Sequence, residues 1–316
     1  MRTKPPPAWA QTAAARIRSQ LGADAKIGLI LGTGWGDAVK LEDEKHRRFS
    51  DFASIFQNLP TIPGHQRCVI YGRLSGVPVL GLAGRIHLNE APADPDLPDM
   101  VRVQTAMLIE AGCQTLIVTS AVGSLTEDIK VGDVVLPYGL VTLFAPPMPL
   151  YAGEFVSPED AIDRETLQQV FYRCRQTETH GDGWNLPLRV TRGNHAMLRG
   201  PFFEGRRCDK ALLAKCGADV VGMSLLPELC VAALYPGVKV IPLTFVTNTA
   251  SEEHSHEENQ ARAREKAEAL GDLVSHTVRL VSGLPEETGA DAADGPGDGN
   301  GSGDDNDPDD GALASW

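Results

Sequence analysis

Short, largely apolar runs that stop at glycine-rich or small polar segments recur along this chain, and segments of helical spacing separate them. Residues 26–31 (KIGLIL) stop at the glycine-rich segment 32–36, and residues 115–119 (TLIVT) lead into the small residues of 120–124. A longer run occupies residues 238–246. Apolar runs without alternation are typical of strands that are buried on both faces, in sheets covered by helices. The pattern therefore predicts an α/β fold: a single domain with a central mixed, largely parallel β-sheet flanked by helices.

The segments between these runs carry helix and hairpin signals. Apolar residues at helical spacing, closed by glycine at several ends, predict helices at 9–21, 101–111, 203–215, 226–234 and 257–281. Two short apolar runs, 68–72 and 77–82, flank a Leu-Ser-Gly turn and predict a β-hairpin.

Acidic residues gather at the C-terminal end. The chain has 29 Lys+Arg and 42 Asp+Glu, a net charge of −13, and residues 286–316 hold ten of these acids and no basic residue, which leaves −3 for residues 1–285. A nearly neutral body lacks the basic surface that nucleic-acid binding requires. The Gly/Asp-rich end cannot bury enough apolar surface to offset the entropy of ordering. We therefore expect a folded domain at 1–283 and a disordered tail at 284–316, which serves as a solubilising extension or, alternatively, as an acidic interaction arm.

Neither a membrane span nor a disulfide framework is indicated. No apolar run approaches the roughly 18–20 residues of a membrane helix, and prolines at 5–7 stand where a signal peptide would be apolar. The six cysteines include no Cys-x-x-Cys pair, so we interpret them as reduced, mainly buried thiols. These features predict a cytoplasmic protein that does not bind membranes.

Polar groups follow several of the expected strands, which is where open α/β sheets bind ligands. The segment after the first strand offers backbone N–H groups and the Thr33 hydroxyl to an anion, although its G-x-G-x-G spacing fits neither a P-loop nor a dinucleotide fingerprint. Arg85 and His87 alternate, so both would face one side of an extended segment and could grip a phosphate. The Ala121 N–H and the Ser224 hydroxyl follow other strands. Taken alone, a turn or a surface side chain explains these signals better, but their recurrence at several strand ends predicts one shared anion.

Two further segments carry weaker signals. Glu204 opens an expected helix, where a carboxylate is either a favourable dipole partner or a ligand-binding group. Residues 252–258 (EEHSHEE) hold His254 and His256 two positions apart, which is not the His-Glu-x-x-His spacing of a helical zinc site. We predict no metal site, and we interpret the segment as a solvated helix start with His256 near the rim of a pocket.

In combination these segments resemble the trimeric purine nucleoside phosphorylases, the family that also contains methylthioadenosine phosphorylase. The similarity extends from about residue 26 to residue 280. Its most specific stretches are 62–65 (IPGH), 84–87 (GRIH), 131–134 (VGDV), 200–204 (GPFFE), 217–224 (GADVVGMS) with 227–228 (PE), and 247–248 (TN). The resemblance implies an enzyme of purine salvage, a homotrimer that splits a purine nucleoside with inorganic phosphate into free base and ribose 1-phosphate, without metal or cofactor.

The resemblance also assigns roles to residues. The implied phosphate-binding residues are Thr33, His65, Arg85, His87, Ala121 and Ser224. The implied nucleoside-binding residues are Asn89, Phe203, Glu204, Met223, Asn248 and His256, and the implied catalytic residues are Asn248, Glu204 and His87. The chain departs from the family in having Asn89 where many relatives have tyrosine, in a shorter stretch before His256, and in the pattern of residues 138–143.

Hydrogen-bonding chemistry at the base predicts a preference for 6-oxopurines. The Glu204 carboxylate would accept the N1–H of hypoxanthine or guanine and repel the N1 lone pair of adenine, while the Asn248 amide would donate to N7 or O6. We therefore expect inosine, guanosine and their deoxy forms as substrates. One alternative is a methylthioadenosine phosphorylase, which Thr33 favours and Asn248 opposes. Another is a non-catalytic purine- or phosphate-binding relative, which Asn89 motivates. A nicotinamide-dinucleotide enzyme is disfavoured by the glycine spacing.

Overall fold

The computed structural model describes residues 8–57, 66–91, 93–175, 183–198, 200, 205, 208–249 and 256–284. Contacts divide the chain into a compact unit, Met1–Pro285, and a C-terminal stretch, Glu286–Trp316. That division lies two residues beyond the boundary expected from the sequence. The C-terminal stretch lies outside the described residues, so its expected disorder stays a prediction.

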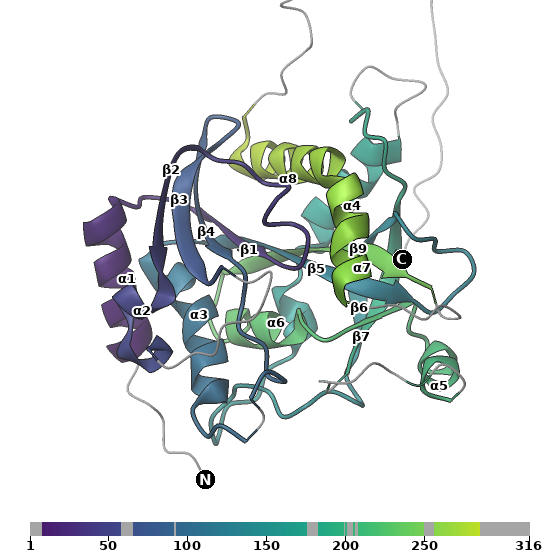
Figure 1. The fold of residues 1–316 in the computed structure, drawn as a ribbon, viewed down its shortest axis with the longest axis horizontal. Coiled ribbons are helices and arrows are strands. Elements are labelled where there is room, and N and C mark those ends of the chain that lie inside the picture. The colour runs from purple at the N-terminus through teal and green to yellow at the C-terminus, as the bar shows by residue number, and fades with distance from the viewer. Residues whose placement is uncertain are drawn as a thin grey trace, which may run out of the picture. The chain divides into compact units, whose positions relative to one another are not determined.

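Among the described residues, nine strands form one mixed sheet in the order β2-β3-β4-β1-β5-β8-β7-β6-β9 (Figure 1). The strands are β1 (Ile27–Leu31), β2 (Glu42–Arg48), β3 (Cys68–Leu74), β4 (Val77–Ala83), β5 (Thr115–Ser124), β6 (Val134–Val141), β7 (Val190–Met197), β8 (Val220–Gly222) and β9 (Lys239–Asn248). β9 also pairs with β5, so β5, β8, β7, β6 and β9 form a closed ring. Pairing is parallel between β1 and both β4 and β5, between β5 and β9, and between β7 and both β6 and β8. The expected mixed α/β sheet is confirmed.

Helices cover the sheet on both sides. They are α1 (Ala8–Leu21), α2 (Phe49–Phe52), α3 (Leu97–Ala111), α4 (Arg164–Arg175), α5 (Asp209–Lys215), α6 (Leu226–Ala232), α7 (His256–Glu265) and α8 (Ala267–Ser282), with short 3₁₀ turns at Ser54–Phe56 and Pro158–Ala161. α1 packs against α3, and α3 packs against α6. In Figure 1, α1 and α3 lie on one side of β1 and β4, and α8 lies on the other. None of the described helices is long and apolar enough to cross a membrane.

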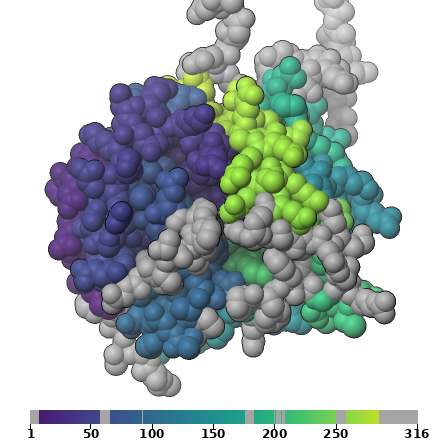
Figure 2. Space-filling model, viewed as in Figure 1, coloured from purple at the N-terminus to yellow at the C-terminus, as the bar shows by residue number. Residues whose placement is uncertain are grey.

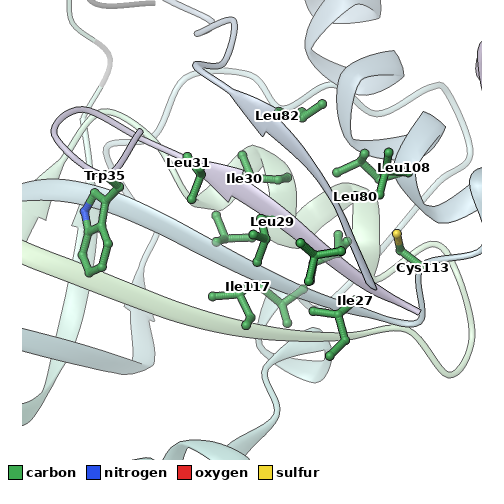
Figure 3. Packing of buried hydrophobic residues seen from close by; sticks show 14 of the residues in the cluster. Ile27, Leu29, Ile30, Leu31, Trp35, Leu80, Leu82, Leu108, Cys113 and Ile117 are labelled. Carbon is green, nitrogen blue, oxygen red and sulfur yellow. The ribbon is translucent and has the colours of Figure 1, made fainter. Parts of the chain in front are cut away.

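β1 lies in the centre of the hydrophobic core. All five of its residues are buried, which explains its uninterrupted apolar sequence. Figure 3 shows Leu29 of β1 among side chains of the neighbouring strands, including Leu80 of β4 and Ile117 of β5. Removing such apolar surface from water stabilises the fold by about 25 cal/mol per Å². The core therefore fixes β1 between β4 and β5, and with it the segments that follow these three strands.

The loop after β1 is held by the C-terminal helices. Gly34 has φ +82°, and a Cβ there would lie 2.1 Å from the Cβ of Ala263 in α7. A Cβ on Gly271 of α8 would lie 2.3 Å from the carbonyl oxygen of Ala38. Figure 2 shows the yellow-green C-terminal helices beside the purple N-terminal part of the chain on this face. Close backbone approach therefore fixes the position of this glycine-rich loop.

Two expected helices differ from those observed. Of the helix expected at 203–215, the described helix is α5, which begins at Asp209. Gly205 lies outside it, and its N–H donates to the Asp209 carboxylate 2.8 Å away. The helix expected at 257–281 is two helices, α7 and α8, which are separated at Lys266. α8 buries an apolar face, whereas α7 is mostly polar. A continuous helical pattern in the sequence therefore concealed a break between two differently packed helices.

The cysteines are all free, as expected, but fewer are buried than the sequence indicated. Two are buried, two are half-buried and two are exposed: Cys113 and Cys230, then Cys68 and Cys174, then Cys208 and Cys216. The expectation of mainly buried thiols was therefore wrong for the last pair, which lies at the two ends of the short surface helix α5.

Candidate functional site

β5 pairs with β1, β8 and β9, so the ends of these strands lie beside it. It extends further than the sequence predicted, through Ser124, so Ala121 lies inside a strand rather than beyond one. Ala121 pairs with Phe245 of β9, and Gly123 pairs with Asn248. A Cβ on Gly123 would lie 2.7 Å from Asn248 Nδ2. The small residues of β5 therefore allow the Asn248 amide to approach the backbone closely.

The segments that carry Thr33 and Arg85 meet beside the middle of β5. β1 pairs in parallel with β4 and with β5, so the segments that follow β1 and β4 lie close together. A Cβ on Gly32 would lie 3.0 Å from Arg85 Nη2 and 3.1 Å from the Cα atom of Ser120. Thr33 is half-buried in the turn that follows. Two of the residues predicted from different strand ends are therefore near neighbours.

The segment after β8 reaches the same part of β5. β8 pairs antiparallel with the end of β5, and a Cβ on Gly222 would lie 3.4 Å from the Ala121 carbonyl oxygen. Ser224 follows two residues later and is buried. The Ala121 backbone and the segment that carries Ser224 therefore lie close together.

Asn248, at the end of β9, is oriented by its own neighbour. Its side chain is buried, and its Oδ1 accepts a hydrogen bond from the Thr247 hydroxyl at 3.2 Å. Nδ2 has only a long contact of 3.5 Å, to the Thr249 carbonyl oxygen. An amide oxygen that already accepts a hydrogen bond leaves the nitrogen as the donor for a ligand.

Asn89, Met223 and Gly200 lie together. Asn89 Nδ2 is 3.2 Å from Met223 Sδ. Gly200 has φ +53°, and a Cβ there would lie 2.4 Å from Asn89 Nδ2 and 2.8 Å from Met223 Sδ. Gly200 therefore lies against two of the residues predicted to bind the nucleoside.

A carboxylate that sequence reasoning missed positions His87. Glu90 Oε1 accepts hydrogen bonds from the His87 backbone N–H and from His87 Nδ1, both at 3.0 Å, and Glu90 Oε2 pairs with Arg67 at 2.5 Å. Because an ionised carboxylate only accepts, Nδ1 carries the proton and the ring orientation is fixed. The three-residue spacing between His87 and Glu90 was the available sequence signal.

Arg85 is buried and paired with a second carboxylate that sequence reasoning did not connect to it. Its side chain is 1% exposed, and Nη1 lies 2.8 Å from Glu228 Oε1. Nη2 donates to the backbone carbonyls of Thr119 and, at 3.5 Å, Ile30. The guanidinium is therefore anchored to α6, β1 and β5 together.

A buried histidine, also missed from the sequence, lies next to this group. A Cβ on Gly222 would lie 3.1 Å from His195 Cε1, and His195 is 1% exposed. Burial lowers the pKa of His195 to about 4; the nearby Ser224 backbone raises it, and the Arg85 charge lowers it further. Neither ring nitrogen has a partner of good hydrogen-bond geometry among the described residues. His195 is therefore a neutral imidazole at neutral pH.

The remaining predicted site residues are not placed. His65, Phe203 and Glu204 lie outside the described residues. His256 begins α7, and only its backbone is described. Within the described ranges, no group of three or more His, Cys, Asp or Glu side chains is arranged to hold a metal ion.

Comparison with known proteins defines the class. The sequence-family model of the phosphorylase superfamily matches residues 26–279, so the chain belongs to that superfamily. It is 31% identical over 283 residues to the purine nucleoside phosphorylase of Mycobacterium tuberculosis, which covers 86% of this chain and 96% of the relative. The Bos taurus purine nucleoside phosphorylase is 29% identical over 266 residues, 79% of this chain and 87% of the relative. The predicted resemblance to the purine nucleoside phosphorylases is confirmed, and the chain is an enzyme of the pentosyltransferase type.

Solved structures show the same fold. The Schistosoma mansoni purine nucleoside phosphorylase in complex with inosine is 24% identical, with a TM-score of 0.71 over 89% of this chain and 98% of that one. The Schistosoma enzyme in complex with guanosine is 23% identical, with a TM-score of 0.70 and the same coverage.

Proposed function

We propose that this enzyme catalyses the phosphorolysis of inosine, guanosine and their deoxy forms to the free base and (deoxy)ribose 1-phosphate, as a cytoplasmic step of purine salvage. Inorganic phosphate is the co-substrate, and no cofactor takes part. The observation that carries the proposal is the Asn248 amide, which is buried at the end of β9 against Gly123 and presents Nδ2 as its donor.

Phosphate binds, in this proposal, where the strand ends meet beside β5. The hydroxyls of Thr33 and Ser224, the Arg85 guanidinium and the Ala121 N–H hold its oxygens, and His65 lies near them. Such preorganised donors stabilise an anion without reorganising during the reaction. His87, with Nδ1 committed to Glu90, offers Nε2 to a protonated phosphate oxygen.

Bond breaking is assisted at the leaving base. The N-glycosidic bond breaks through an oxocarbenium-like sugar, while negative charge develops on the purine. The Asn248 amide donates to N7, where this charge appears, so it stabilises the transition state more than the ground state. Phosphate below the sugar stabilises the cation and then attacks C1′. Glu204 accepts the N1–H of a 6-oxopurine.

The sugar lies, in the same proposal, between the phosphate and the base. Met223 packs under the ribose. The Asn89 amide, whose Nδ2 lies 3.2 Å from Met223 Sδ, forms a hydrogen bond with a ribose hydroxyl. Phe203 packs against the sugar or base, and His256 approaches the 5′-hydroxyl.

A homotrimer is the proposed assembly. The apolar side chains Leu143 and Phe155 are 79% and 94% exposed and would be candidates for burial in such an assembly. Light scattering should give about three times the chain mass of 33.9 kDa, and a monomer mass would contradict this assembly.

A coupled assay of base release tests the proposed activity. We expect hypoxanthine release from inosine only when phosphate is present, and kcat/KM for inosine about 10⁴-fold above that for adenosine, because a mismatched base leaves buried polar groups unpaired. Faster turnover of methylthioadenosine would favour the methylthioadenosine phosphorylase alternative. Calorimetric binding of hypoxanthine without turnover of any nucleoside would favour a non-catalytic relative.

A further inference from the structure

The 227–228 motif carries a residue to which the proposed reaction assigns no task. Glu228 lies in the first turn of α6, is 2% exposed, and contacts Arg85 from 143 positions away in the sequence. We propose that Glu228 is a positioning residue for phosphate binding: it holds the Arg85 guanidinium in the orientation from which Arg85 binds phosphate. This inference rests on the proposed function.

The geometry of the guanidinium supports this role. A guanidinium is planar, so fixing its two terminal nitrogens also fixes the direction of Nε–H. Glu228 holds Nη1 at 2.8 Å, and the carbonyls of Ile30 and Thr119 accept from Nη2. Without Glu228, the group would be anchored only from the Nη2 side and could rotate about that edge. The carboxylate therefore determines the plane of the group.

The pair is incomplete, which distinguishes it from a saturated structural ion pair. Arg85 Nε and Glu228 Oε2 are both buried, and neither has a hydrogen-bond partner among the described residues. Buried polar atoms without partners are rare and call for a ligand or water. A bound phosphate oxygen would supply the acceptor that Arg85 Nε–H lacks.

The turn before α6 links this pair to another proposed phosphate-binding group. Leu225 stands between Ser224 and the helix, is fully buried, and has φ +80° and ψ −52° although it is not glycine. A side chain is held in this region only where its surroundings determine it, and such residues cluster at functional sites. The same rigid turn therefore fixes the Ser224 hydroxyl and, one helical turn later, the Glu228 carboxylate.

The neutral His195 beside the pair adds no competing charge. It lies against Gly222, two residues before Ser224. Among the described residues, Glu228 is the charged side chain that pairs with Arg85. Its effect on Arg85 can therefore be tested by a substitution at position 228.

Steady-state kinetics of Glu228→Gln would test the proposal. We expect the KM for phosphate to rise about 10- to 100-fold, as misplacement of a binding group typically does, while the KM for inosine changes less than about threefold. Glu228→Asp, which keeps the charge, should recover part of the phosphate affinity. The matched control is Glu154→Gln, which removes a carboxylate bound to Arg102 at 2.6 and 2.9 Å and should leave the KM for phosphate unchanged.

A double variant keeps the test valid if Glu228→Gln folds poorly. Arg85→Gln with Glu228→Gln removes the buried unpaired charge as well. If Glu228 acts only through Arg85, adding Glu228→Gln to Arg85→Gln should not weaken phosphate binding further. Additive losses, or a phosphate KM that stays constant or falls in Glu228→Gln, would overturn the inference.

Calorimetry with inorganic phosphate alone separates this inference from the proposed function. Wild-type protein that does not bind phosphate would overturn the proposed function and the role of Glu228 together. Wild-type binding that Glu228→Gln retains at equal affinity would overturn the role of Glu228 alone.

Discussion

Replacing His195 with glutamine should reduce the loss of stability that the wild-type protein suffers in weak acid. In the folded protein His195 is buried and neutral, with a pKa lowered from 6.5 to about 4. The unfolded chain binds a proton at this side chain near pH 6.5, whereas the folded chain does so only near pH 4. The stability gained by keeping His195 neutral is therefore fully present above pH 6.5 and is lost as the pH falls from 6.5 towards 4.

The size of the effect follows from these two pKa values. Between pH 7.5 and pH 5.0, linkage predicts that this one group lowers the free energy of unfolding by about 2 kcal/mol, given a folded pKa of about 4. Glutamine keeps a polar side chain of similar size but does not titrate. His195→Gln should therefore lose about 2 kcal/mol less than the wild type over this interval, whatever its stability at pH 7.5.

Urea unfolding at pH 7.5, 6.0 and 5.0, at one fixed protein concentration, measures this difference. His46, which is exposed on the edge strand β2, provides the matched control. His46→Gln should follow the wild-type pH dependence, because the His46 side chain is already exposed to solvent in the folded protein. If the wild type and His195→Gln lose equal stability between pH 7.5 and 5.0, the assignment of a buried neutral His195 is wrong.

Two substitutions test the glycine-rich loop and the base site. Gly34→Ala should destabilise the protein by about 2 kcal/mol or more, because Gly34 has φ +82° and a Cβ there would lie 2.1 Å from Ala263. The control is Gly36→Ala, which should change the melting temperature little because its Cβ would meet nothing within 4 Å. Equal changes in melting temperature for the two variants would refute the contact between Gly34 and Ala263. Asn248→Asp should shift kcat/KM from inosine towards adenosine, because a carboxylate accepts from a 6-amino group; uniform loss on both nucleosides would contradict the specificity argument.

Elements whose burial is local were predictable from the sequence. β1, the β3–β4 hairpin and helices α1 and α3 were expected within a few residues, because their apolar patterns match their own burial. β2 was not expected, since its sequence EDEKHRR is exposed throughout. It is a strand because it pairs with the edge of β3, and that pairing leaves no periodic signal in the sequence.

The site could be predicted only in its outline. Polar residues at strand ends indicated Thr33, Arg85 and Ser224, because the ends of neighbouring parallel strands lie at one edge of a sheet. Their supporting partners, Glu90 and Glu228, were missed as such. The Arg85–Glu228 contact joins residues 143 positions apart, and only the fold determines which carboxylate meets which guanidinium.

A crystal structure of the protein soaked with inorganic phosphate and hypoxanthine tests the central claim most directly. We predict phosphate oxygens about 3 Å from the Thr33 and Ser224 hydroxyls and from the Ala121 nitrogen. We also predict that the N7 edge of hypoxanthine faces Asn248 Nδ2, above the same phosphate. Phosphate bound away from β5, or hypoxanthine out of reach of Asn248, would contradict the proposed arrangement of the two ligands.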